Sequence, residues 1–175
     1  MNSHLIVTAL GLNSPEALKQ FTAAIKDSGC NIEQSRSTLL NEVICLHMLL
    51  SGSWDSIAKF ENSLPRLEQR LELSILCRRS STHSTNNKMM PYAIEIVAFD
   101  QAGIVHDVVK FMLENKLVIH DLYTNTYKAN LTGAMMFTMH MTINIPADIS
   151  IAGIRGDFID FCDQLNLDAI MEPVK

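Results

Sequence analysis

Basic residues, paired cysteines and long apolar runs are all scarce in this sequence, and each scarcity excludes a class of protein. Fourteen Lys and Arg stand against nineteen Asp and Glu, a formal net charge of −5, whereas a nucleic-acid surface needs clustered cations to displace counterions from phosphates. No segment approaches the roughly 20 apolar residues of a membrane-spanning helix, and the short apolar run 5–12 has no basic leader. We therefore expect a soluble, cytoplasmic protein that contacts neither DNA nor a membrane directly.

The four cysteines are far apart and form no C-x-x-C pair. They are Cys30, Cys45, Cys77 and Cys162. This spacing fits neither a zinc site nor a disulfide framework, and it predicts buried free thiols in a reducing compartment. The sequence also lacks a nucleophile elbow, a phosphate loop and metal-ligand spacing. We expect no enzyme activity, no metal and no cofactor; a small ferredoxin-like enzyme is an alternative that no motif supports.

The apolar pattern gives the same order of elements twice, in residues 1–79 and 91–175, on either side of a polar linker at 80–90. Period-2 runs predict strands, and apolar residues spaced i, i+3 and i+4 after a capping residue predict helices. The strands are expected at 5–10, 32–40, 43–50 and 71–77, and again at 94–99, 117–127, 134–143 and 167–171. Each half therefore has the order βαββαβ, with Pro65 expected to end or kink one helix.

Two short matches support a duplication: V-T-A at 7–9 with V-A-F at 97–99, and L-H-M at 46–48 with M-H-M at 139–141. A βαββαβ unit makes a four-stranded antiparallel sheet with both helices on one face. The predicted fold class is therefore α+β, with two tandem ferredoxin-like units. In the first unit the other sheet face is largely apolar along 43–49, so we expect the second unit or a second copy, as in a homodimer, to cover it.

A glycine turn at Asp100–Ile104 follows the strand at 94–99. Gly103 lets the chain reverse, and the helix that starts at Ile104 directs its free N–H groups and positive dipole end toward the turn. These donors can hold a carboxylate, and Asp100 can pair with an ammonium group. The turn therefore predicts a site for a free amino acid; an ordinary strand-to-helix connection is the alternative.

Tandem βαββαβ units with the D-x-x-G-I turn at Asp100–Ile104 resemble paired ACT domains, which are small-molecule sensors of amino-acid metabolism. The first unit adds V-T-A-L-G at 7–11, G-C-N-I-E-x-S-R at 29–36 and M-L-L-S-G-S-W at 48–54, which resemble the family of glycine cleavage system transcriptional repressors. The resemblance implies a regulator that responds to glycine and acts by binding a DNA-bound transcriptional activator protein. A regulatory subunit that controls a metabolic enzyme is the alternative.

The two units depart from the family pattern in complementary ways. The first turn, L-N-S-P-E at 12–16, lacks the Asp and Gly of the family. ACT sites often use an Asn just before the second strand; Asn31 has this place in the first unit, whereas Val118 has it in the second. We therefore expect one composite effector site, with Asn31 contributed by a first unit of the same chain or of a dimer mate. Its other members are Asp100, Gln101, Ala102, Gly103, Ile104 and Val105. The alternative is a partner-binding module whose ligand sites have decayed.

Overall fold

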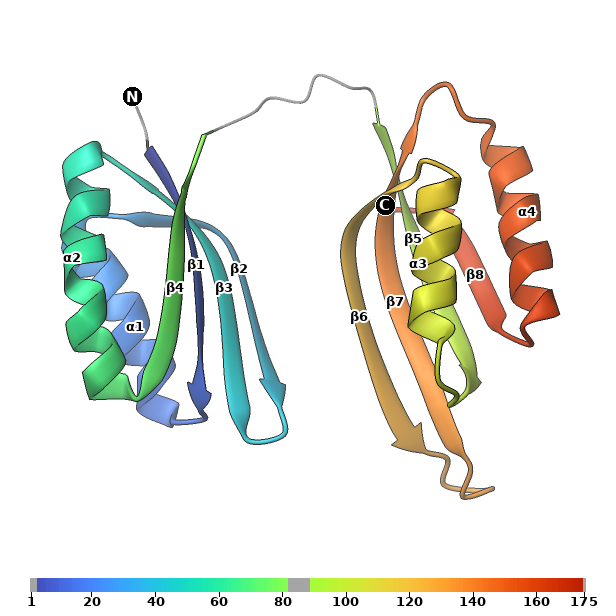
Figure 1. Ribbon diagram of the computed structural model, residues 1–175, viewed down its shortest axis with the longest axis horizontal. Helices are drawn as coiled ribbons and strands as arrows, with labels where there is room; N and C mark the ends of the chain where they lie inside the picture. The colour runs from blue at the N-terminus through green and yellow to red at the C-terminus, as the bar shows by residue number, and fades with distance from the viewer. Residues whose placement is uncertain (1–2, 82–88, 175) are drawn as a thin grey trace. The chain divides into compact units, whose positions relative to one another are not determined.

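The computed structural model describes residues 3–81 and 89–174, apart from the side chain of Pro15, so most of the predicted linker lies outside the described residues. The chain divides into two compact units, Met1–Ser84 and Thr85–Lys175, and each has the order βαββαβ (Figure 1). The first contains β1 (Ser3–Leu12), α1 (Pro15–Ser28), β2 (Asn31–Leu40), β3 (Val43–Gly52), α2 (Trp54–Leu71) and β4 (Leu73–Ser80). The second contains β5 (Met89–Phe99), α3 (Ile104–Glu114), β6 (Val118–Lys128), β7 (Met135–Pro146), α4 (Ile151–Gln164) and β8 (Asp168–Pro173).

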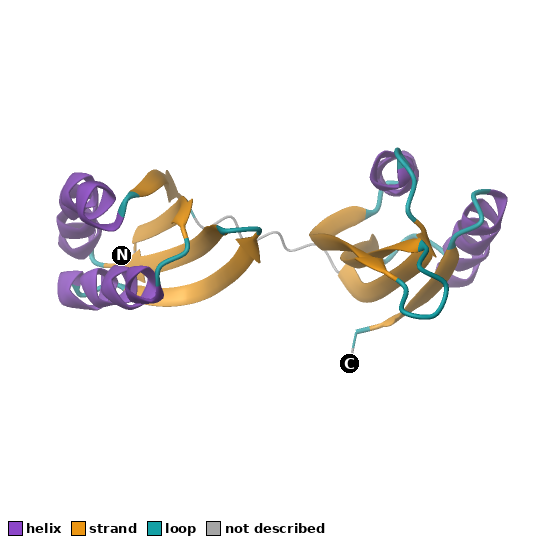
Figure 2. Ribbon diagram, turned by 90° about the horizontal axis from the view of Figure 1, so that it is seen from below, coloured by secondary structure: helices purple, strands orange, loops and turns teal. Residues whose placement is uncertain are grey.

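Each unit has one antiparallel sheet with both helices on one face (Figure 2). The strand orders are β2-β3-β1-β4 and β6-β7-β5-β8. Alternate residues of the central strands point into the core: in β7, Met139, Met141 and Ile143 are buried, whereas Thr138 and Thr142 are only half-buried. The predicted α+β fold with two ferredoxin-like units is therefore confirmed.

The open sheet face of the first unit is as apolar as the sequence predicts. Val43, Cys45 and Leu49 of β3 are half-buried there, and Ile6 and Leu10 of the neighbouring β1 are exposed. A covering second unit or second copy stays a prediction.

Strand register shows which residues of the two units correspond. Leu12 pairs with Val43 and Phe99 with Met136, so His47 corresponds to His140, as the L-H-M match predicts. The V-T-A match is wrong, because residues 7–9 correspond to 94–96 rather than to 97–99. Both faces of β5 near its end carry apolar side chains, so the apolar pattern could not fix the register.

Residues with a left-handed backbone conformation at the helix ends confirm this correspondence. Gly29 (φ 80°) after α1 matches Lys116 (φ 59°) after α3, and Glu72 (φ 53°) after α2 matches Asn166 (φ 54°) after α4. The same backbone reversal returns the chain to the sheet in both units.

Pro65 does not end its helix, because α2 continues to Leu71. The neighbouring Leu64 and Leu67 are buried in the core, and their packing offsets the backbone hydrogen bond that proline cannot make.

The four cysteines are free, but the prediction that they are buried is wrong for Cys77. Cys77 is exposed on the edge strand β4, Cys30 and Cys45 are half-buried, and only Cys162 is buried. Burial raises the pKa of the Cys162 thiol to about 12. Within the described range, no helix is long and apolar enough to cross a membrane.

Candidate functional site

The glycine turn of the second unit joins β5 to the N-terminus of α3. Asp100 N–H donates to the carbonyl of Met135 (2.9 Å), which fixes the end of β5 against β7. Gly103 precedes the helix at φ 102°, a backbone conformation that L side chains rarely adopt. The first helical hydrogen bond runs from Asp107 N–H to the Gly103 carbonyl (3.0 Å), so the N–H groups of residues 104–106 have no acceptor within the helix.

A pocket of about 490 Å³ opens at this helix N-terminus. It is lined by Gln101, Gly103, Ile104, Val105, His106, Val109 and Phe137. Ile104 and Phe137 are buried core residues, whereas Gln101 and His106 are exposed, so the pocket has an apolar wall and a polar rim. This combination and the size are typical of small-molecule sites.

Two carboxylates lie beside the same turn. Asp100 is exposed at its start, and Asp107 in the first turn of α3 points back toward it: a Cβ on residue 103 would lie 3.7 Å from Asp107 Oδ2. Free N–H groups and the helix dipole favour an anion, whereas the carboxylates favour a cation. Such a mixture suits a ligand that carries both charges better than a simple anion.

The structure brings together four of the six predicted residues of this turn. Gln101, Gly103, Ile104 and Val105 line the pocket, and Asp100 and Ala102 are exposed beside it. Sequence reasoning missed His106, Val109 and Phe137. The register could have indicated Phe137, because it pairs with Ala98, two residues before the turn.

The corresponding turn of the first unit is shorter. Both units have eighteen residues between the first two strands, 13–30 and 100–117, but α1 begins at the third of them and α3 at the fifth. Ser14 precedes α1 in an extended conformation (φ −125°), and proline at the first helical position is preorganised for helix. Two residues that form the loop in the second unit are therefore helical in the first.

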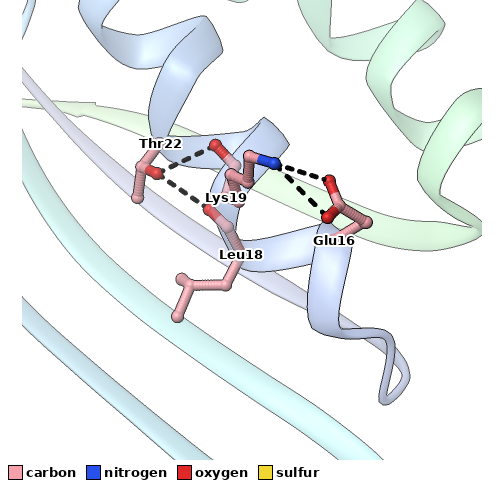
Figure 3. Close-up of polar contacts among 4 residues, drawn as sticks. All are labelled: Glu16, Leu18, Lys19 and Thr22. Atoms are coloured by element: carbon pink, nitrogen blue, oxygen red, sulfur yellow. Dashed lines mark hydrogen bonds and ion pairs between the residues drawn. The ribbon is translucent and has the colours of Figure 1, made fainter.

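The first helix also begins with a carboxylate where the second has its glycine. Glu16 corresponds to Gly103, and its Oε2 lies 3.3 Å from Lys19 Nζ (Figure 3). One turn further on, the Thr22 hydroxyl donates to the carbonyls of Leu18 and Lys19 (2.9 and 3.0 Å). Pro15 contributes no N–H donor. This helix N-terminus therefore offers an anion fewer donors and a competing negative charge.

Asn31 is the exposed first residue of β2 and pairs with Ser51. Val118 has the same place at the start of β6 and pairs with Asn144. A bulge follows both, between Ile32 and Gln34 in the first unit and between Ile119 and Asp121 in the second. The predicted correspondence of Asn31 with Val118 is therefore confirmed.

Comparisons with known proteins agree with this geometry. Residues 3–78 match the ACT domain family. The glycine cleavage system transcriptional repressor of Escherichia coli (strain K12) is 28% identical over 163 residues, 93% of this chain and 86% of that protein.

Two solved structures share the fold of the whole chain. A crystal structure assigned to a glycine cleavage system transcriptional repressor covers 100% of this chain and 99% of its own (TM-score 0.75, 22% identity). A protein of unknown function from Galdieria sulphuraria covers 100% of both chains (TM-score 0.79, 21% identity). Residues 3–78 thus match the ACT domain family, the second unit repeats the fold of the first, and the chain is similar along nearly its whole length to the glycine cleavage system transcriptional repressor of Escherichia coli.

Proposed function

We propose that this chain is an amino-acid-responsive regulator of the glycine cleavage system that acts through a DNA-bound transcriptional activator protein, with glycine as its effector. The observation that carries the proposal is the pocket at the α3 N-terminus, which combines the first N–H groups of the helix with an apolar wall and has two carboxylates beside its turn. The similarity to named repressors supports the regulatory role. The net charge of −5 supports indirect rather than direct contact with DNA.

In this proposal the ligand carboxylate accepts hydrogen bonds from the N–H groups of Ile104, Val105 and His106. The ammonium group pairs with Asp100 or Asp107, whose carboxylates flank the turn. Asn31, an exposed amide at the start of β2, adds a further hydrogen bond from its own chain or from a second copy. Because turn and helix start form the pocket together, the ligand stabilises one conformation of this surface, and the partner responds to that conformation.

Titration calorimetry with glycine, serine and alanine tests the site. Gly103→Val introduces a β-branched residue at a positive φ and is expected to weaken glycine binding at least about tenfold. Glu16→Val places the same residue at the corresponding position of the first unit and should leave binding unchanged. Asp100→Asn and Asn31→Ala test the two polar contacts without altering the backbone. No saturable heat from any of the three amino acids would refute the effector site.

A gel-shift experiment tests the indirect action. DNA upstream of glycine cleavage genes, with its activator bound, is incubated with this chain in the presence or absence of glycine. We expect a change in the activator–DNA complex and no shift of DNA by the chain alone. A shift of free DNA would contradict the proposal; no effect on the complex would favour a subunit that controls an enzyme.

A further inference from the structure

The first unit has a hollow of its own, between its helices rather than at its turn. A groove of about 510 Å³ runs between α1 and α2, which lie side by side over the sheet (Figure 1). Ala23, Ala24 and Leu67 supply its apolar part, and Lys59, Arg66 and Arg70 line it with positive charge. Asp27 also lines the groove, so three cations and one carboxylate surround the apolar part, and positive charge is in excess.

The groove lies where the first unit has smaller, non-aromatic side chains than the second. By the register of the strands and the left-handed residues, Ala24 corresponds to Phe111 and Leu67 to Phe161. Those two phenylalanines stack with ring centroids 4.8 Å apart between α3 and α4. The same space is therefore filled in the second unit and open in the first.

The charge of the groove is also specific to the first unit. Arg66 corresponds to Asp160 of α4. Lys59 Nζ donates to the carbonyl of Asp27 (2.6 Å), whereas the guanidinium groups of Arg66 and Arg70 have no ion pair or hydrogen bond with any residue in the described ranges. Like charges four residues apart on a helix repel each other, so this pair is unfavourable until an anion approaches.

We propose that this groove binds an acidic amphipathic segment of a partner protein. The cations recur at i, i+7 and i+11 on α2 and therefore extend about 16 Å along the helix axis, which is more than a free amino acid can span. A helical segment in the groove sets its apolar side on Ala23, Ala24 and Leu67, and its carboxylates pair with the guanidinium groups, which bind carboxylates in a bidentate manner. The inference rests on the partner-dependent part of the proposed function and not on the effector pocket.

The test uses the full chain and a labelled, covalently stabilised helical peptide with Leu on one side and Glu at the spacing of Lys59, Arg66 and Arg70. Fluorescence anisotropy measures its dissociation constant over a range of salt concentrations. We expect saturable binding that weakens with salt, and a loss of about tenfold or more in the double variant R66E/R70E. A peptide with Gln in place of Glu should bind the unchanged chain as weakly as the Glu peptide binds R66E/R70E.

Two further variants, a further peptide and a glycine titration make the result specific. Ala24→Phe should fill the groove as Phe111 does and lose the peptide without any change of charge. The double variant K110E/K128E changes the net charge equally in the second unit and should bind the peptide normally. A Lys-bearing peptide should regain affinity for R66E/R70E if the pairs form directly. Glycine titrations of R66E/R70E should match those of the unchanged chain, which separates failure of the groove from failure of the effector pocket.

The opposite results are equally clear. Equal affinity for the Glu and Gln peptides, or full affinity in R66E/R70E, would overturn the proposal. Saturable binding of inorganic phosphate that depends on Arg66 and Arg70, without peptide binding, would show a small-anion site instead. Absence of binding by the peptide and by phosphate would also overturn it.

Discussion

The two units share one fold and one strand register, yet they differ at two places, and at each place one unit is open where the other is filled. The second unit keeps an open glycine turn and fills the space between its helices with stacked phenylalanines. The first extends its helix into the turn, places Glu16 there, and leaves a cationic groove between its helices. Residues 1–84 contain eight basic and eight acidic residues, whereas residues 85–175 contain six and eleven, so the net charge of −5 resides in the second unit.

Both differences leave the strand order and register of the two sheets unchanged. One is at a strand-to-helix connection, and the other lies between the two helices that cover the sheet. A duplicated domain can therefore change its binding surfaces separately, and we interpret the second unit as the sensor and the first as the surface for the partner.

The largest expected effect, on the free energy of unfolding, comes from truncating two buried side chains at corresponding positions of α2 and α4. Phe158 and Leu64 are both buried; Phe158→Ala should cost about 3–5 kcal/mol and Leu64→Ala about 2–5 kcal/mol of unfolding free energy. The only tryptophan, Trp54, is in the first unit, and all three tyrosines are in the second. Urea unfolding followed by tryptophan and by tyrosine fluorescence therefore reports on each unit separately.

If the units unfold independently, Phe158→Ala shifts only the tyrosine transition and Leu64→Ala only the tryptophan transition. Equal shifts of both signals in either variant would instead mean that the units unfold as one cooperative body, and that the separation of roles does not extend to stability.

A smaller effect is expected from exchanging the two turns. Replacing N-S-P-E at 13–16 by the D-Q-A-G of 100–103 should move the start of α1 from Pro15 to residue 17, because a glycine then stands where Glu16 supports the helix. The first unit should lose about 1 kcal/mol of unfolding free energy. Backbone NMR chemical shifts of residues 13–18 measure the helix start, and tryptophan fluorescence in urea measures the stability.

The reverse exchange at 100–103 serves as the control. It should extend α3 by two residues and abolish glycine binding in calorimetry. An unchanged helix start in both chimeras would mean that the surrounding packing, and not the turn sequence, decides where these helices begin.

The sequence predicted the order of the elements well because each strand and helix has its own periodicity. The second helix and its cap are an example: Ser53 Oγ accepts from Ser56 N–H (3.0 Å) as the capping pattern predicts. Prediction from the sequence failed where two patterns fit equally well. The match of residues 7–9 with 97–99 was three residues off because β5 presents apolar residues on both faces, and Pro65 is tolerated because tertiary packing outweighs local propensity.

The candidate site was predictable only where it is local in sequence. Gln101 to Val105 follow from the turn itself, but Phe137 reaches the pocket through strand pairing and Val109 through the helix. The groove between α1 and α2 was not found at all. It depends on Ala24 and Leu67 meeting across two helices, and neither residue is unusual within its own helix.

The smallest expected effect is a pH dependence confined to the first unit. Arg79 holds Glu61 in a bidentate pair (Nη2–Oε2 2.6 Å, Nε–Oε1 3.0 Å) and lies over the ring of Trp54, 5.4 Å from its centroid. The corresponding positions of the second unit hold Arg155 and Pro173. The hydrogen bonds from Arg79 lower the pKa of Glu61 below its ordinary value of 4.5.

Because the pKa of Glu61 is lower in the folded than in the unfolded chain, the pair stabilises the first unit above pH 4.5 and loses this contribution as pH falls through the folded pKa. Glu61→Gln should therefore lower the tryptophan-detected stability slightly at neutral pH, and less so at high salt. The difference should vanish once Glu61 of the unchanged chain is protonated in both the folded and the unfolded state. Glu42→Gln, at an exposed turn, is the control. A difference between Glu61→Gln and the unchanged chain that persists in acid would mean that the carboxylate acts through packing around Trp54 rather than through its charge.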